Sequence, residues 1–239
     1  MGALLTDIKT GPVGRWDYGT VIDIFLPRVN LSSLAQDDIF SRRNVFAVET
    51  PKGWEVFKAV NAQLVAPNTY RLSKLLRGLD GSSVGMRDMI LAGARVTLLD
   101  IGWTALTVKE SYIGERINVT AQAAGRKSGD LEIEYKANYL RPLPPVHIKI
   151  NHIDTDVIIS WVRQSRIGGE NWSGVDIPLS EDSEMYRVQF LLNNQLVSEY
   201  EAVQTQITRP ESDLSGISQI AIAQGSRSFG WGASAIIEL

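Results

Sequence analysis

The 239-residue sequence contains no cysteine and only two histidines, His147 and His152. The lack of cysteine excludes disulfide bonds, thiolate nucleophiles and zinc sites with cysteine ligands. Both histidines lie near Asp154 and Asp156, but without the fixed spacing that places metal ligands on one face of an element. We therefore predict no metal site and no cofactor, and we expect His147 to point outward from a strand.

The sequence also lacks a concentrated positive charge and a long apolar run. Its net charge is −3, and Arg42-Arg43 and Arg126-Lys127 are basic runs of two residues each. A duplex-binding protein needs clustered Lys and Arg to displace counterions, and a membrane helix needs about 18 apolar residues. The segment up to Gly11 lacks the basic start and apolar core of a signal peptide. We predict no nucleic-acid partner and no membrane insertion, and the lack of cysteine suits a protein that folds in a reducing cytosol.

Motifs for catalysis are missing as well. There is no GxSxG elbow, Ser-His pairing or P-loop. Glycosidic hydrolysis requires two carboxylates that face each other across a cleft. The acidic residues of Asp37-Asp38 and of Glu181-Asp182 are neighbours in sequence, so the two carboxylates of either pair cannot take up that arrangement. Gly78, Gly81 and Gly85 are not followed by the helix that a phosphate cradle needs. The sequence predicts a protein that is not an enzyme.

Two domains are predicted from the proline-rich segment Arg141–Pro145. Its three prolines remove backbone donors and favour an extended linker. We expect a β-rich domain over residues 1–141 and a second domain over residues 142–239. The composition, 44% hydrophobic, is sufficient for two cores.

The first domain is predicted to be mainly strands, with one short helix from Ser32 to Arg43. Pro67 supplies a fixed φ and Asn68 tolerates a turn, so the apolar segments on either side predict a hairpin. The strands are expected at 20–26, 54–65, 70–76, 95–100, 116–121 and 131–139.

The second domain is predicted to be an immunoglobulin-like β-sandwich. About seven short strands alternate apolar and polar residues within roughly 95 residues, which is typical of that fold. Trp161 falls on the apolar face of its strand and is expected in the core. The strands are expected at 146–151, 157–161, 186–192, 195–203, 205–208, 218–223 and 233–239.

Three aromatic residues are candidate ligand-binding residues because they fall on predicted loops. Trp172 lies in a Gly-rich loop, while Phe229 and Trp231 lie between the last two strands. Large rings on loops serve as anchors for sugars or proteins. The alternative is that they fold back over the open ends of the sandwich.

The second domain resembles a fibronectin type III domain. Pro144-Pro145 leads a first strand, and Asp156-Val-Ile-Ile-Ser-Trp161 resembles the second strand with its buried Trp. Glu184–Phe190 resembles the third strand, and 220–225 with 233–239 resemble the last two. The Tyr that usually begins the sixth strand is missing, and Ser218 stands near its place.

A second resemblance covers nearly the whole chain. Arg15-Trp16-Asp17, Gln63–Pro67, Tyr70–Gly78 and Trp161–Trp172 are similar to the C-terminal region of the tail-tip, or baseplate hub, proteins of gene transfer agents and related siphophages. The resemblance implies a structural virion component at the tail tip, a homotrimer in the particle that contacts other tip proteins. The alternative is a module that binds a host receptor or glycan through its loop aromatics. Family members are often longer, so the chain is either a fragment or one part of a split hub.

Overall fold

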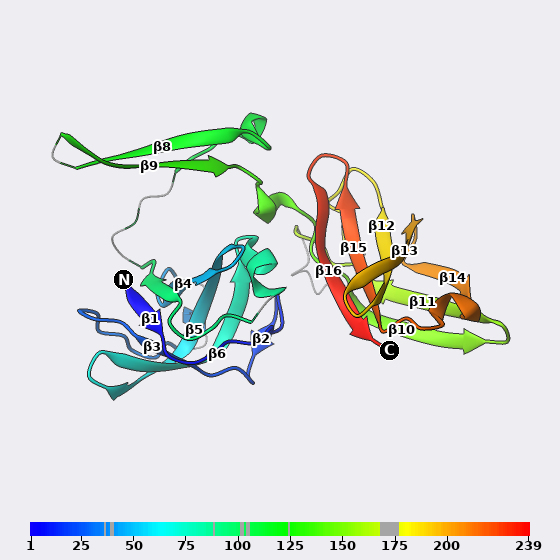
Figure 1. Cartoon of the computed structure of the whole chain (residues 1–239), viewed down its shortest axis with the longest axis horizontal. Helices are drawn as coiled ribbons and strands as arrows, with labels where there is room; N and C mark the ends of the chain where they lie inside the picture. The colour runs from blue at the N-terminus through cyan, green and yellow to red at the C-terminus, as the bar shows by residue number, and fades with distance from the viewer. Residues whose placement is uncertain are drawn as a thin grey trace. The chain divides into compact units, whose positions relative to one another are not determined.

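The computed structural model describes residues 1–35, 37–38, 41–87, 89–100, 103, 106–123, 125–167 and 177–239. The chain forms two compact units, Met1–Tyr139 and Leu140–Leu239 (Figure 1). Both units are built mainly from strands, which confirms the predicted fold class. Short 3₁₀ turns are found at Ser82–Arg87, Glu110–Tyr112, Asn138–Leu140 and Glu211–Leu214. Within the described ranges, no helix reaches the length and hydropathy that crossing a membrane requires.

The first unit is built around a closed antiparallel barrel. Its sheet runs in the order β6-β3-β1-β7-β4-β5, and the pairing of β5 with β6 closes the ring, while β2 adds to the end of β6. Closure leaves these strands without a long free edge. The strands are β1 (Gly2–Leu4), β2 (Trp16–Asp17), β3 (Ile22–Phe25), β4 (Val45–Thr50), β5 (Gly53–Ala66), β6 (Thr69–Leu79) and β7 (Arg95–Leu98).

The hairpin of β5 and β6 supplies one side of the barrel and turns where the sequence predicts it. Pro67 and Asn68 form the turn, and Asn68 has a φ of 56°, a conformation that Asn tolerates better than most residues. Phe57 of β5 stacks on Phe46 of β4 inside the barrel, with ring centroids 5.3 Å apart. The other inward side chains are mainly aliphatic and fully buried: Leu4, Ile8, Ile22, Ile24, Leu72, Leu75 and Val96.

The predicted helix from Ser32 to Arg43 is wrong at both of its ends. Residues 32–35 are not helical and 41–43 are bends, while 36, 39 and 40 lie outside the described residues. The reason is pairing with the barrel. The amide of Leu34 donates to the carbonyl of Val60 at 2.8 Å, and Leu34 packs against Val60. Residues 32–35 therefore follow β5, and helical hydrogen bonds in the described part of this segment are confined to the 3₁₀ turn around 37–38, where the amide of Asp38 donates to the carbonyl of Ala35 at 3.0 Å.

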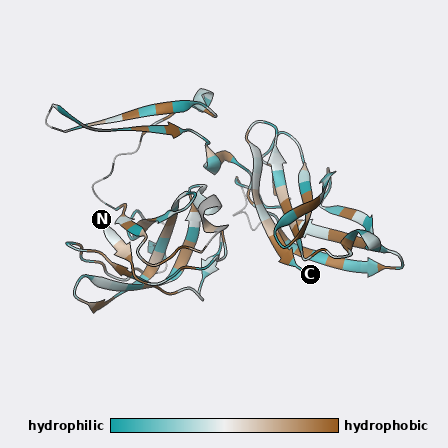
Figure 2. Ribbon diagram, viewed as in Figure 1, coloured by the Kyte–Doolittle hydropathy of each residue, from teal (hydrophilic) through white to brown (hydrophobic). Residues whose placement is uncertain are grey.

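A separate two-stranded ribbon follows the barrel in sequence. β8 (Arg116–Ala123) and β9 (Arg126–Glu134) pair only with each other among the described strands. Ile117 pairs with Ile133 and Val119 with Leu131, so apolar residues share one face, and hydrophobic and hydrophilic residues alternate along β8 and over the last five residues of β9 (Figure 2). β9 ends earlier than the predicted 131–139, because Ala137 takes a positive φ of 44° before the turn at Asn138–Leu140.

The second unit is a sandwich of two antiparallel sheets. One sheet has the order β10-β11-β14 and the other β13-β12-β15-β16, so the first, second and fifth strands of the unit face the other four. This arrangement confirms the predicted fibronectin type III-like sandwich. The strands are β10 (Val146–Ile153), β11 (Asp156–Val162), β12 (Tyr186–Leu192), β13 (Gln195–Ala202), β14 (Gln206–Pro210), β15 (Gln219–Ser226) and β16 (Gly230–Glu238).

The sandwich core lies where the alternation predicts it. Trp161 is 4% exposed and meets the ring of Tyr186 edge-on at 5.1 Å, which confirms its core position. Val157, Ile159, Val188, Phe190, Ile220 and Ile222 complete the cluster. His147 is exposed, as predicted, at an irregularity in the pairing of β10 with β11 where its φ is 54°.

Candidate functional site

Of the predicted loop aromatics, Phe229 lies in the turn between β15 and β16, and Trp172 lies outside the described residues. The loop prediction is wrong for Trp231, which is the second residue of β16 and pairs with Gly225 of β15. Both described rings are half-buried. The guanidinium of Arg166 lies 5.5 Å from the centre of Phe229, and that of Arg187 lies 4.9 Å from the centre of Trp231. A cation over an aromatic face is attractive and occupies that face. Each ring therefore already contacts its own domain.

Trp231 packs across its own hairpin. A Cβ placed on Gly225, its partner across the sheet, would lie 2.6 Å from the indole and 2.9 Å from Met185. Only glycine leaves room for the ring at this position. The indole therefore covers the backbone of β15 and extends the packing of the sheet.

Asp182 anchors the same turn. Its carboxylate accepts hydrogen bonds from the amide of Arg227 at 3.1 Å and from the hydroxyls of Ser226 and Ser228 at 3.4 Å. Desolvation opposes the charged form, but these hydrogen bonds favour it and lower the pKa of Asp182. Glu181 beside it accepts from Arg166 at 2.9 Å. The pair Glu181-Asp182 thus serves loop structure, and its two carboxylates have separate partners.

The histidines and the other acidic pair are not gathered into a site. His152 lies 3.1 Å from Glu211, and both side chains are exposed, while Asp37 and Asp38 are exposed as well. Among the described residues, no three His, Asp or Glu side chains lie together as metal ligands.

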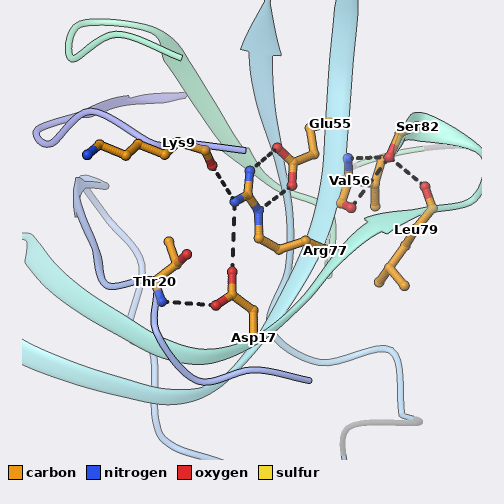
Figure 3. A network of polar contacts seen from close by, with 8 residues as sticks. All are labelled: Lys9, Asp17, Thr20, Glu55, Val56, Arg77, Leu79 and Ser82. Atoms are coloured by element: carbon orange, nitrogen blue, oxygen red, sulfur yellow. Dashed lines mark hydrogen bonds and ion pairs between the residues drawn. The ribbon is translucent and has the colours of Figure 1, made fainter. Parts of the chain in front are cut away.

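A buried ionic centre inside the barrel was not predicted from the sequence. Nε and Nη2 of Arg77 donate to the two carboxylate oxygens of Glu55, each at 2.8 Å, and Nη1 donates to the carbonyl of Lys9 at 2.7 Å (Figure 3). The carboxylate of Asp17 lies 3.8 Å from the same guanidinium and accepts hydrogen bonds from the amides of Gly19 and Thr20. These groups tie the N-terminal segment to β5 and β6. The centre is structural, since Arg77 and Glu55 are both almost fully buried.

The outer face of the barrel carries an aromatic pair that was likewise not predicted as a site. The rings of Trp16 and Tyr18 lie 6.3 Å apart, and Nζ of Lys74 lies 5.3 Å and 5.9 Å from their centres. Near it, Val21, Ser33, Asn61, Gln63, Arg71 and Ser73 line a shallow depression of about 420 Å³. The sequence signal was the spacing of Trp16 and Tyr18 on either side of Asp17, which points both rings away from the buried carboxylate.

The comparisons with known proteins concern the first unit above all. Residues 1–97 match a family described as Rcc01698-like, C-terminal. The family name points to gene transfer agent proteins, so this similarity agrees with the resemblance over those residues and does not extend to the sandwich. No curated protein matches the chain.

Among solved structures, the chain is similar to the rat CD45 extracellular region, domains d3–d4, at 10% identity and a TM-score of 0.31. The match covers 57% of this chain and 69% of that one. At this score the likeness adds nothing to the fold assignment, which rests on the strand order of the two sheets.

Proposed function

We propose that the chain is a structural component of the tail tip, or baseplate hub, of a phage or gene transfer agent. The match of residues 1–97 to the Rcc01698-like family supports this proposal. The observation that carries it is the exposed apolar face of the ribbon formed by β8 and β9. This face needs a partner, and an assembly of tip proteins supplies one.

The ribbon is poorly stable without such a partner. Leu131 is 59% exposed and Ile133 42% exposed, although both belong to the apolar face. An isolated two-stranded hairpin is only marginally stable in water. Polar side chains on the opposite face of the ribbon are paired with one another: Arg116 forms an ion pair with Glu132, and Thr120 donates a hydrogen bond to Asp130 at 2.8 Å. Burial against a neighbouring tip subunit would therefore cover the apolar face and leave the paired charges in solvent.

In the particle we propose three copies around the tip axis. The eight residues of β8 span about 26 Å at 3.3 Å per residue, and two strands are about 10 Å wide, so the face offers roughly 260 Å². A stable interface needs about 800 Å² per partner. The ribbon alone cannot hold a trimer, so the isolated chain is expected to be monomeric and the symmetry is imposed by other tip proteins.

The remaining parts of the proposal follow from this role. The protein is made in the bacterial cytoplasm, acts in the virion without catalysis, and helps to form the surface that meets the host. Binding of a receptor through Phe229 and Trp231 is not favoured, because both rings are half-buried and pack against Arg166 and Arg187 of their own domain.

The experiment is to replace Leu131 and Ile133 together with serine in a strain that produces the particles. Particles carrying this variant should lose the chain from purified tails or lose infectivity, whereas Asn118→Ser on the polar face should have no effect. The circular dichroism spectrum of the purified variant must match that of the parent chain, so that the loss cannot be attributed to unfolding of the barrel or the sandwich. Normal incorporation and infectivity of the double variant would contradict the proposal.

A further inference from the structure

The outer face of the barrel has the features of a small binding site that is separate from the sandwich loops. Trp16 is anchored there because it packs with Leu76 against the outer cluster of Leu34 and Val60. Tyr18 extends from the same segment and is 68% exposed. One ring is thus fixed by packing, and its neighbour presents most of its surface to solvent.

Lys74 is held beside these rings by an unusual backbone conformation. It has a φ of 54° within β6, where a residue other than glycine is unfavourable. Its neighbours Leu72 and Leu75 point into the barrel, yet its ammonium lies over Trp16 and Tyr18 on the outside. A strained residue of this kind is a reason to look for function at that position.

The depression spans β5 and β6 beside the residues that hold the aromatic pair. Ser73 precedes Lys74, Asn61 follows Val60, and Ser33 precedes Leu34, so the residues that line it adjoin the outer cluster. Its polar groups are held in place before any ligand arrives.

Hydrogen bonds fix these groups to one another. Asn61 donates to the hydroxyl of Ser73 at 3.1 Å, and Arg71 forms two hydrogen bonds with Asp23, each at 2.8 Å. The amide oxygen of Asn61 and the hydroxyl of Ser73 keep lone pairs that can accept further hydrogen bonds. Because Asp23 neutralises Arg71, the depression carries little free charge.

We propose that this surface binds a hexose-containing glycan. A sugar ring has an apolar C–H face that stacks on an aromatic ring, and its hydroxyl groups donate to and accept from amides and hydroxyls of the kind in the depression. A polyanion would need more unpaired cations, and an apolar peptide would need an apolar groove. This inference does not depend on the tail-tip role, and it places the site on the first unit, whereas Phe229 and Trp231 belong to the second.

The test is to probe the purified chain on an array of bacterial surface polysaccharides and neutral oligosaccharides, and then to titrate the best-bound oligosaccharide by calorimetry. Tyr18→Ala should weaken binding by about three- to tenfold, the loss of one stacking contact. Tyr18→Phe should keep most of the affinity. Tyr112→Ala is the control, since Tyr112 is also an exposed tyrosine of the first unit and lies outside the proposed site.

Three results would overturn the proposal. The first is an array with no glycan bound above the signal of an unrelated protein. The second is binding that Tyr18→Ala leaves unchanged. The third is binding that is lost on Phe229→Ala or Trp231→Ala instead, which would place the glycan at the sandwich.

Discussion

Replacing Arg77 by methionine removes the guanidinium from the buried ionic centre while keeping a long apolar side chain. Glu55 then stays fully buried without the two hydrogen bonds of 2.8 Å that neutralise it, and Asp17 loses its nearest cation. Breaking a buried ion pair from one side costs about 3–5 kcal/mol, because an uncompensated charge remains. We expect the free energy of unfolding of the barrel to fall by that amount.

The chain supplies its own control for this prediction. Arg71 and Asp23 form a pair with the same two hydrogen bonds of 2.8 Å, but the side chain of Arg71 is 52% exposed. Arg71→Met should cost less than about 1 kcal/mol, as is usual for surface pairs. The two variants differ mainly in burial, so their difference measures the effect of the buried charge.

A double variant separates charge from packing. Arg77→Met with Glu55→Leu removes both partners, and replacing a buried pair with apolar residues is often neutral. The double variant should therefore be more stable than Arg77→Met alone. Urea unfolding gives the free energies, and hydrogen exchange of β5 and β6 amides assigns the transition to the barrel. A loss below about 1 kcal/mol for Arg77→Met, or no recovery in the double variant, would refute this reasoning.

Three further predictions concern stability. Trp161→Ala should destabilise the sandwich by about 3–5 kcal/mol and the half-buried Phe229→Ala by clearly less, as measured by urea unfolding; equal losses would contradict the assignment of the core. The hydrogen bonds from Arg71 outweigh burial and lower the pKa of Asp23, so its stabilisation is present above about pH 4 and is lost as the pH falls through the lowered value. The difference in urea midpoint between the parent and Asp23→Asn should accordingly shrink as the pH falls from about 5 to about 2, the range in which Asp23 becomes protonated. A difference that stays constant over this range would contradict the stabilising role of the Asp23 carboxylate. Residues 140–239 expressed alone should unfold in one cooperative transition, and a molten product would place the domain boundary elsewhere.

The sandwich could be predicted closely because its strands alternate. Tyr186, Val188 and Phe190 occupy every second position of β12, and all three are fully buried, so the local pattern already specifies the inward face. The prediction for this strand has the same bounds as the structure, 186–192. Where side-chain alternation and tertiary burial agree, sequence alone is sufficient.

The barrel was predicted less well because local patterns do not specify closure. β1 and β2 have three and two residues, too short to show a period, and in β4 Phe46, Ala47 and Val48 are all buried, so alternation is lost. Leu34 was assigned to a helix because its pairing with Val60 is not visible in its own segment. Long-range pairing decided each of these cases.

The candidate sites show the same limit. Phe229 could be located on a loop from sequence, but Trp231 belongs to β16, and the cations over the two rings come from Arg166 and Arg187, far away in the chain. The ionic centre joins Arg77 to Glu55 across 22 residues. Which polar side chains meet inside a barrel depends on register, which the sequence pattern did not provide.

The central claim is tested most directly by a three-dimensional reconstruction of the tail end of the particle that carries this chain. We expect density for the barrel and the sandwich in three copies related by rotation, with the ribbon of β8 and β9 packed against a neighbouring subunit through the face that contains Leu131 and Ile133. One copy or six copies would contradict the proposed symmetry. Absence of the chain from the tip, or a ribbon whose apolar face stays in solvent, would contradict the proposed function itself.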